Sequence, residues 1–563
     1  MFKRVLVAAL MASAFTLTPA AADDIADYQE SLALLQAGEW SAAEEVLTRL
    51  IASNPQQGRY WHYRAVARAR YGDCAAALPD FETALSLGST GSVHGMRRAY
   101  FDAAACASEV GETDRAIAYL GTAQGRYGLD VAGQTGDDAR FDPIRTTPGF
   151  AWLAGSDTAD LSRDAGWRHD IRWFDDLVRR RHPNPFHSVS EADWAREIEA
   201  LYASTPRLSD IEMVAGFMRL ACLINDGHTA IYPPFDGEMA FSLLPVWPYL
   251  LGDRWTILAA APGYEDLIGA EIDAIEGVPI DAAIDVIDAH MASDHAQTVR
   301  WIGAIALQFS DIGAAFFGAS QSDHLSLTLS HPGGARFDVS LPGSPIDRNI
   351  MSRWAPDGWS SLASATPPLW LQEIDETFRI VPLPQMDALY VQINQIRDGE
   401  TMDFETFAET VHATLETGGQ SHLILDLRHN NGGNGHLNTA LVHAIIRSET
   451  INRRGGLFVI TGRRTFSAAQ LLINTLDFET DAIFVGEISS SSPTFYGEDT
   501  MMSLPWSGLS GSISSRWFQN YFMDDDERPW IPVDLPAPLT REALMAGEDP
   551  ALDAIAARIA QED

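Results

Sequence analysis

The 563-residue chain contains a single lysine, Lys3. A lysine side chain therefore cannot serve as a catalytic base or nucleophile beyond the first few residues. Positive charge is scarce in general, with 39 Lys and Arg against 77 Asp and Glu and a formal net charge of -38. Such an acidic excess argues against nucleic acid and anionic membranes as partners, because both attract basic surfaces.

Cysteines and long apolar segments are also few. The three cysteines, Cys74, Cys106 and Cys222, are too few for a disulfide scaffold. Cys74 and Cys106 either pair with each other or are small buried residues of helices. Beyond the first residues no stretch reaches the length of a membrane helix, so membrane insertion is not expected.

The N-terminus is predicted to be a secretory signal peptide over residues 1–22. It has a basic start at Lys3 and Arg4, an apolar centre over residues 5–17 that is too short to span a bilayer, and small residues before Asp23. Cleavage after Ala22 would give an exported protein, either periplasmic or secreted.

Residues 23–137 are predicted to form helical repeats. Gly38, Gly72 and Gly111 lie 34 and 39 positions apart, each between one amphipathic helix and the next. A period near 34 with a Gly turn between two helices is typical of tetratricopeptide repeats. Such a domain either binds a protein partner in its groove or caps the rest of the molecule, and the sequence favours neither.

The predicted fold class is multidomain α+β. Residues 138–156 are rich in helix breakers and are predicted to be a link. Helical periodicity over 157–235 predicts a helical cap, and short strands with turns over 236–345 predict a β-rich module. Residues 367–563 alternate strand and helix, which predicts βαβ units around a largely parallel sheet with ligands at the carboxyl ends of its strands.

Two loops are expected to meet at one such edge. The segment from Leu457 to Glu487 is predicted as strand, turn, helix and strand, with Ser467 at the start of the helix, where free N–H groups favour negative charge. On position alone Ser467 is either an N-cap or a nucleophile. Asn430-Asn-Gly-Gly433 follows another predicted strand, His422 to Leu427, and its glycines can aim N–H groups at a developing oxyanion.

A third segment supplies a histidine. Asn225-Asp-Gly-His-Thr229 contains a turn signal, which places His228 in a loop that enters the next strand. Histidine is the natural base near neutral pH. Taken alone, a loop histidine is more commonly a surface or structural residue.

The motifs together resemble the tail-specific serine peptidase family, which includes the C-terminal processing peptidases, the tricorn core and the repeats of interphotoreceptor retinoid-binding protein. The resemblance extends from about Trp167 to the C-terminus. It rests on the segments Asn225–Thr229, Leu267–Ile280, Asp426–Gly433, Thr465–Ala469, Val485–Glu487 and Pro532–Asp534. It implies a PDZ-like module around Leu267–Ile280, a crotonase-like α/β catalytic core and a peptide or protein substrate, with no cofactor.

The resemblance also assigns roles to residues. Ser467 matches the nucleophile, and Gly432 or Gly433 with the amide of Ala468 matches the oxyanion hole. Processing peptidases pair the serine with a lysine some two dozen residues downstream, where this chain reads Ile488-Ser-Ser-Ser-Ser-Pro493. A Ser–Lys dyad is therefore excluded.

His228 is the expected base instead, because it matches the Asp-Gly-His-Thr motif of the tricorn-like branch. A carboxylate should orient a catalytic histidine. Glu487, Glu498 and Asp226 are the alternatives, and Glu487 ranks first because it follows the strand that adjoins the nucleophile's helix.

Other clusters do not predict a metal site. His429, His436 and His443 recur every seven residues, which on a helix is a rise of about 10.5 Å, too far to share a zinc ion bound at about 2.1 Å. The acidic run Asp524–Glu527 lacks the spaced glycine loop of a calcium site and is predicted to be solvated charge. Arg463 and Arg464 either steer a substrate carboxylate or are exposed turn residues.

The predicted function is that of an exported serine hydrolase, and specifically a peptidase. One alternative is a ligand-binding or peptide-binding protein on the same scaffold, as the retinoid-binding relatives exemplify. Another is an esterase or amidase that uses the same site, because specificity depends on pocket shape. The sequence carries no signal for oligomeric state.

Overall fold

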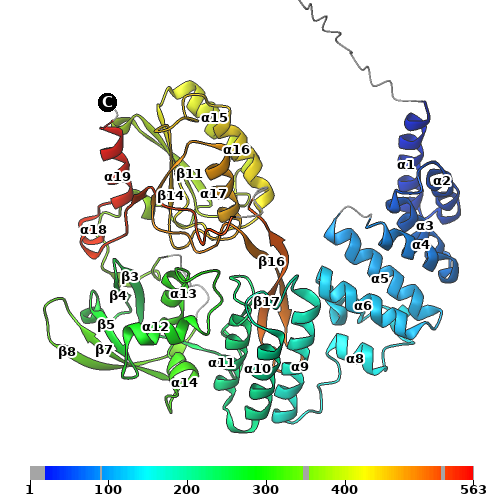
Figure 1. The fold of residues 1–563 in the computed structure, drawn as a ribbon, viewed down its shortest axis with the longest axis horizontal. Helices are drawn as coiled ribbons and strands as arrows, with labels where there is room; N and C mark the ends of the chain where they lie inside the picture. The colour runs from blue at the N-terminus through cyan, green and yellow to red at the C-terminus, as the bar shows by residue number, and fades with distance from the viewer. Residues whose placement is uncertain (1–18, 89–91, 347–353, 521–525, 562–563) are drawn as a thin grey trace, which may run out of the picture. The chain divides into compact units, whose positions relative to one another are not determined.

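The computed structural model describes residues 19–88, 92–346, 354–520 and 526–561 (Figure 1). Most of the predicted signal peptide therefore lies outside the described residues. The chain divides into two compact units, Met1–Asp160 and Leu161–Asp563. In the described part of the chain, no helix combines the length and the apolar character needed to cross a membrane.

The first unit is helical. Its main helices are α1 (Pro19–Ala37), α2 (Trp40–Ser53), α3 (Gly58–Arg70), α4 (Cys74–Ser86), α5 (Val93–Glu109) and α6 (Thr113–Tyr127), and each packs against the next. Gly38, Gly72 and Gly111 lie in turns between helices with φ of 77°, 94° and 81°, a conformation that glycine adopts without strain. A disulfide between Cys74 and Cys106 joins α4 to α5.

Residues 138–156 are not the simple link that the sequence predicted. They contain a short 3-10 helix, Ala139–Phe141, and the helix α8 (Pro148–Ala154). The Thr147 side chain caps α8, because its hydroxyl accepts the Phe150 N–H. Thr-Pro-Gly here starts a helix, since proline is well suited to the first helical position. Phe141 and Phe150 are buried in the core of the first unit.

The second unit begins with three helices, α9 (Arg163–Arg181), α10 (Glu191–Ser204) and α11 (Asp210–Cys222). Residues Ser209 and Glu212 form a capping box at the start of α11, which satisfies N–H groups that a helix start leaves free. The chain then passes through the His228 loop into the short strand β1 (Ala230–Ile231).

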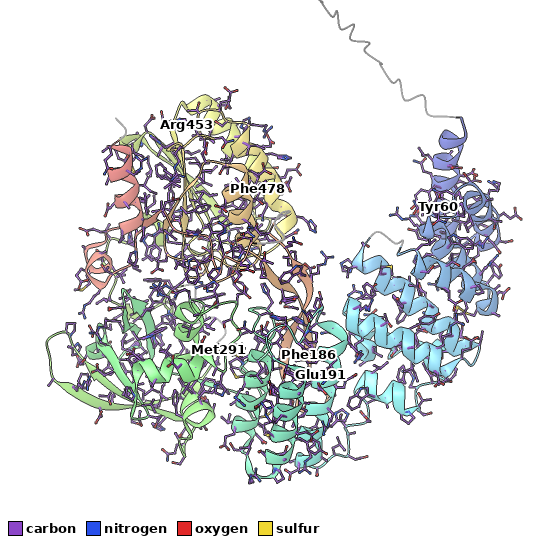
Figure 2. All side chains as sticks on the ribbon, viewed as in Figure 1. Tyr60, Phe186, Glu191, Met291, Arg453 and Phe478 are labelled. Atoms are coloured by element: carbon purple, nitrogen blue, oxygen red, sulfur yellow. A yellow bond between two sulfur atoms is a disulfide. The ribbon has the colours of Figure 1, made fainter. Side chains whose placement is uncertain are left out.

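A β-rich module follows. Its antiparallel sheet contains β3 (Val246–Leu251), β4 (Arg254–Ala260), β5 (Glu271–Ile275), β6 (Val278–Pro279), β7 (His324–Ser330), β8 (Arg336–Pro342) and β10 (Ser360–Ser361). Its helices are α12 (Ile280–Asp288), α13 (Val299–Ala306) and α14 (Ile312–Phe317). The turn predicted at Glu276 and Gly277 is present, and both residues have positive φ, 50° and 78°. Met291, just beyond α12, lies where this module meets α11 (Figure 2), and its carbonyl accepts a hydrogen bond from the Cys222 thiol.

The core sheet has the order β11-β12-β13-β14-β15-β18, and every neighbouring pair except β11 with β12 is parallel. The strands are β11 (Phe378–Leu383), β12 (Ala388–Ile393), β13 (His422–Asp426), β14 (Leu457–Thr461), β15 (Ile483–Gly486) and β18 (Leu535–Pro536). The helices α15 (Phe404–Gly418), α16 (Asn438–Ile446) and α17 (Ala468–Glu479) cover one face, and α19 (Pro550–Ile559) covers the other (Figure 1). Alternate residues of each strand serve the two faces.

A long hairpin was not foreseen from the sequence. Strands β16 (Phe495–Ser503) and β17 (Ser510–Phe518) pair with each other, and β17 also pairs with β1. The hairpin leaves the core sheet and packs against α9 (Figure 1). It thereby connects the loop that carries His228 to the part of the chain that carries Ser467.

Candidate active site

Ser467 lies in the turn between β14 and α17 in an unusual backbone conformation. Its φ is 55° and its ψ is -121°, and its side chain makes no capping hydrogen bond. Ser467 therefore occupies the N-cap position of α17, but its side chain does not cap the helix. A non-glycine residue in such a region costs about 1–3 kcal/mol and persists only where the surrounding structure enforces it.

The turn is enforced by neighbouring backbone on the side of the glycine loop. The Thr465 hydroxyl accepts the Gly462 N–H at 2.9 Å and donates to the Leu427 carbonyl at 2.8 Å. The Phe466 N–H donates to the Asn430 carbonyl at 3.1 Å. These bonds tie the turn to the end of β13.

The serine-rich loop enforces the turn from the other side. The Ser467 N–H donates to Ser491 Oγ at 3.1 Å, and the Ser490 N–H donates to the Thr465 carbonyl at 2.9 Å. Ser489, Ser490 and Ser491 are all buried. The serine-rich loop thus holds the backbone of Ser467.

His228 reaches Ser467 directly. Its Nε2 lies 2.9 Å from Ser467 Oγ, although the two residues are 239 positions apart. The imidazole is only 6% exposed. It stacks on Phe466 at 4.5 Å between ring centres and on Phe495 at 5.5 Å, so the two aromatic rings fix its plane.

Asp226 holds the loop that carries His228, but it does not bind the His228 ring. Its Oδ1 accepts the N–H groups of His228 at 2.8 Å and Thr229 at 2.7 Å and the Ser514 hydroxyl at 2.8 Å. Its Oδ2 accepts from His182 Nε2 at 3.0 Å. Burial acts to raise the pKa of Asp226, but the bonds from His182 and Ser514 bring it below its usual value. Asp226 is thus a charged anchor for the loop.

The imidazole of His228 is poised to be neutral. Burial lowers its pKa, and the nearby carboxylates of Asp226 and Asp499 and the carbonyl of Tyr496 oppose that shift. Nε2 faces the Ser467 hydroxyl, so the ring proton belongs on Nδ1 for His228 to act as a base. Nδ1 is buried, and no described atom meets full hydrogen-bond geometry with it. The Tyr496 carbonyl acts to raise the pKa of His228.

Glu487 does not fill the role that the sequence ranked first for it. Both of its carboxylate oxygens bind Arg463, at 2.9 Å from Nε and 2.5 Å from Nη2. Arg300 lies 3.8 Å away on the same carboxylate. Burial acts to raise the pKa of Glu487, but Arg463 and Arg300 lower it below its usual value. Glu487 is a structural ion-pair residue and not the partner of His228.

Arg463 corrects a second expectation. Its side chain is 3% exposed and also donates to the Leu250 carbonyl at 2.7 Å, so it is neither an exposed turn residue nor a group that meets substrate. An ion pair buried with further hydrogen bonds fixes geometry, because both charges must stay matched.

The glycine loop presents one free amide beside Ser467. The Gly432 N–H already donates to Asn430 Oδ1 at 3.0 Å. Among the described residues, no acceptor bonds the N–H of Gly433 or of Ala468. A Cβ on Gly432 would lie 2.7 Å from Ser467 Cβ, so this close approach requires glycine. Of the two glycines that the sequence proposed, Gly433 is therefore the one whose N–H is unbonded in the described part of the chain, as is the N–H of Ala468.

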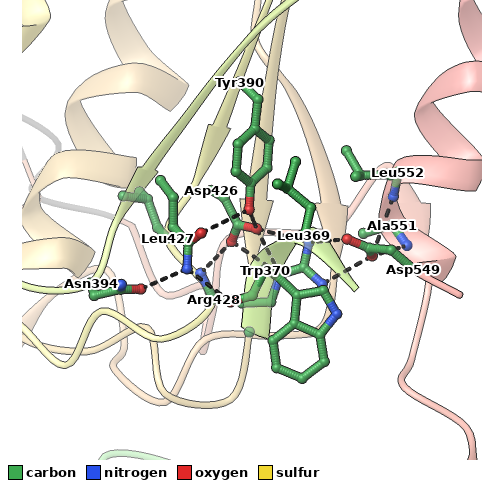
Figure 3. Close-up of polar contacts among 12 residues, drawn as sticks. Leu369, Trp370, Tyr390, Asn394, Asp426, Leu427, Arg428, Asp549, Ala551 and Leu552 are labelled. Atoms are coloured by element: carbon green, nitrogen blue, oxygen red, sulfur yellow. Dashed lines mark hydrogen bonds and ion pairs between the residues drawn. The ribbon is translucent and has the colours of Figure 1, made fainter. Parts of the chain in front are cut away.

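A charged network anchors the strand before this loop (Figure 3). Arg428 binds Asp426 at 2.8 Å and both oxygens of Asp549 at 3.0 Å, and the Tyr390 hydroxyl donates to Asp426 at 2.7 Å. The Arg428 guanidinium lies over the Trp370 ring at 5.2 Å. The Asp426-Leu-Arg428 part of the motif is therefore structural and fixes where β13 ends.

A cleft of about 440 Å³ opens beside the serine and the free amides. Its lining combines the glycine loop, the start of α17 and the hairpin, through Gly433, Asn434, Gly435, His436, Ser467, Ala468, Leu471, Phe495, Glu498, Asp499, Arg516 and Phe518. Ser467 is partly exposed there. Sequence reasoning considered Glu498 only as a partner for His228 and missed Asp499 and Arg516, because nothing local marks where a hairpin folds back.

The remaining sequence clusters lie as follows. His429 is buried against Trp370, at 5.0 Å between ring centres, while His436 lines the cleft, so they do not share a site. Within the described residues the acidic run is represented by Asp526 and Glu527. Asp526 binds Arg528, which lowers its pKa to about 2.

No family model matches the chain, and neither does any curated protein sequence. Among solved structures, mature CPAF in complex with lactacystin matches with a TM-score of 0.49 and 12% identity, over 71% of this chain and 99% of that one. The photosystem II D1 C-terminal processing protease matches with a TM-score of 0.33 and 15% identity over 70% and 97%. A putative S41 protease from Bacteroides fragilis matches with 0.32 and 13% over 69% and 97%. The likeness to these proteins is one of fold.

Proposed function

We propose that this chain is a serine peptidase that uses Ser467 as nucleophile and His228 as general base. The observation that carries the proposal is the 2.9 Å separation of His228 Nε2 and Ser467 Oγ. This geometry fits a nucleophile activated by an adjacent base. The strained backbone at Ser467 and the free amides of Gly433 and Ala468 support the same assignment.

In the proposed reaction, Ser467 Oγ attacks the carbonyl carbon of a peptide bond while its proton passes to His228 Nε2. The carbonyl oxygen becomes an oxyanion that accepts hydrogen bonds from Gly433 and Ala468. When the C–N bond breaks, the proton on Nε2 moves to the leaving amine. Water then attacks the acyl ester by the same route and releases Ser467 with its proton restored.

A fluorophosphonate probe tests the nucleophile directly, because it labels activated serines covalently. We expect labelling of the wild type and of the Ser503→Ala control, whose serine is exposed on β16, but not of Ser467→Ala. Equal labelling of all three would refute the assignment. A folded wild type that takes no label but retains a ligand would favour a binding protein.

A mixture of peptides separates the peptidase from an esterase or amidase. We expect the wild type to release new peptide termini, detected by mass spectrometry, and His228→Ala to release none. Turnover of activated esters without any peptide cleavage would assign the same site to a non-peptide acyl bond.

We also propose roles for the other parts of the chain and an exported location. The helices α1–α6 would form a tetratricopeptide-like domain that binds a protein partner, residues 236–345 a PDZ-like module and residues 367–563 a crotonase-like core. Export would follow from the signal sequence over residues 1–22, and the Cys74–Cys106 disulfide supports it, because such bonds persist in oxidising compartments. Fractionation of the producing cell tests export through cleavage after Ala22 and the location of the protein.

A further inference from the structure

The loop between α12 and α13, residues 289–298, contacts the backbone next to His228 and the serine-rich loop that holds Ser467. On the histidine side, Asp294 Oδ1 accepts the Gly227 N–H at 2.6 Å, one residue before His228. A Cβ on Gly227 would lie 3.0 Å from that oxygen and 2.8 Å from the Phe466 ring. The loop therefore packs tightly against the backbone that carries His228.

The Asp294 carboxyl group also contacts the serine-rich loop that holds Ser467. The Ser491 hydroxyl and the Ser492 backbone interact with the Asp294 carboxyl group and oppose the rise in its pKa that burial causes. Ser491 Oγ is the acceptor for the Ser467 N–H at 3.1 Å. Four residues further along the loop, the Thr298 hydroxyl donates to the Ser490 carbonyl at 3.0 Å. One carboxyl group thus connects the residue beside His228 with the residue that holds Ser467.

Keeping a carboxyl group at this position is costly. Part of the Asp294 residue is exposed, but its Oδ2 is buried and has no hydrogen-bond partner among the described residues. The groups that face it supply no counter-charge: Asp226 is acidic, and burial lowers the pKa of the His295 ring to about 4, so that ring is neutral. Burial raises the pKa of Asp294 to about 7.

The carboxyl group of Asp226 differs from that of Asp294 in its hydrogen bonds and in the direction of its pKa shift. Asp226 is buried as a whole residue, yet it accepts four hydrogen bonds, one of them from His182, and burial does not prevent a lowered pKa. A buried carboxyl without such compensation destabilises the fold. Groups of this kind concentrate at functional sites, where their geometry is needed.

We propose that Asp294 is a positioning residue of the Ser467–His228 dyad, which holds the Gly227 amide and the Ser491 hydroxyl and so fixes the two catalytic loops relative to each other. This inference rests on the proposed function. It makes the β-rich module part of the active site's framework, because that module supplies the residue that sets the serine-to-histidine distance.

The test compares labelling rates with a fluorophosphonate in the full chain. Asp294→Ala removes both contacts and should label about 10- to 100-fold more slowly, the size expected when a reacting pair is misplaced by about 1 Å. Asp294→Asn keeps an acceptor for Gly227 and should recover most of the rate. Asp311→Ala is the matched control, because Asp311 is a buried acid of the same module that accepts the Ser242 N–H at 2.6 Å. It should label like the wild type.

The pH profile separates positioning from general stability. The wild-type labelling rate should rise as pH rises through about 7, because an ionised carboxylate holds the Gly227 amide and the Ser491 hydroxyl more strongly. Asp294→Asn should lack this step and keep the separate step from His228. A wild-type rate and profile in folded Asp294→Ala would overturn the proposal.

Hydrogen exchange tests Asp294 independently of any chemistry at Ser467. Asp294→Ala should exchange faster than Asp311→Ala in peptides that cover residues 224–231 and 463–472, while Asp294→Asn stays near the wild type. Unchanged exchange in both segments would refute the positioning role. If the wild type takes no fluorophosphonate label, the proposed nucleophile is wrong, and this comparison still decides whether Asp294 holds the two loops.

Discussion

Arg463 and Glu487 form a buried bidentate ion pair at the end of the nucleophile's turn, with contacts of 2.9 and 2.5 Å. Arg463 also donates to the Leu250 carbonyl of β3. The pair therefore joins the core sheet to the β-rich module. Glu487 follows the strand next to the nucleophile's helix, but its carboxylate binds Arg463 and does not contact His228.

Glu487→Gln should destabilise the fold and leave the chemistry of the folded protein largely intact. Removing one partner of a buried ion pair leaves the other charge uncompensated, which costs about 3–5 kcal/mol. Urea unfolding should show that loss of stability. In the folded variant, the fall of the fluorophosphonate labelling rate at acid pH, which reports His228, should stay where it is in the wild type. A variant of unchanged stability that has lost labelling would restore Glu487 as a catalytic group.

The pH profile of labelling should report His228. Because its pKa is lowered by burial, the ring stays neutral, and therefore basic, below the usual value for histidine. Apart from the step near pH 7 expected from Asp294, labelling should fall as pH falls through this lowered pKa. Asp499 acts to raise the pKa of His228, so Asp499→Asn should move the acid side of the labelling profile to still lower pH. This move should be smaller at high salt, because salt screens an exposed charge. A limb that moves to higher pH would contradict this electrostatic picture.

Gly432→Ala should abolish labelling, or reduce it by about 100-fold or more, because the new Cβ would lie 2.7 Å from Ser467 Cβ. Gly252→Ala is the matched control. Gly252 also has positive φ, 62°, but a Cβ there meets nothing within 4 Å. Both variants carry the backbone strain, and only Gly432→Ala should displace the serine. Equal labelling rates for the two variants would show that the Ser467 backbone accommodates the new Cβ at position 432 without losing reactivity.

Local patterns in the sequence predicted much of this arrangement. The strand–turn–helix around Ser467, the glycine turn after β13 and the loop with His228 each have a short signature of apolar periodicity and turn residues. The lack of lysine reduced the choice of base. The serine turn and the glycine turn were proposed together because parallel strands bring their carboxyl ends to one edge. His228 was added because its motif resembles that of the tricorn-like branch.

Contacts made by distant segments could not be predicted in the same way. Whether Glu487 faces Arg463 or His228 depends on side-chain packing and not on sequence spacing. The pairing of β17 with β1, which brings Ser514 to Asp226, joins residues 288 positions apart. Asp294 has no local motif at all, because its role depends on how the β-rich module meets the core.

Asp294→Asn should stabilise the protein at alkaline pH while it keeps most of the labelling rate. The folded-state pKa of Asp294 is raised to about 7, so the folded protein holds this proton longer than the unfolded chain does. Stability from this group is therefore present at low pH and is lost as pH rises from about 4 to about 7. Removing the charge should recover about 2–4 kcal/mol at pH 8 and little at pH 4. Urea titrations of both proteins at the two pH values measure the difference.

The Cys74–Cys106 disulfide should stabilise the first unit alone. It closes a loop with a sequence separation of 32, for which a loss of about 3–4 kcal/mol is expected on removal. The double variant Cys74→Ser with Cys106→Ser should lower the melting temperature of the first unit. Labelling of Ser467 should not change, because every residue assigned to the proposed site lies in the second unit. A reductant should lower the melting temperature of the wild type and leave that of the double variant unchanged. If the reductant lowered the melting temperature of both proteins equally, a group other than this disulfide would be responsible.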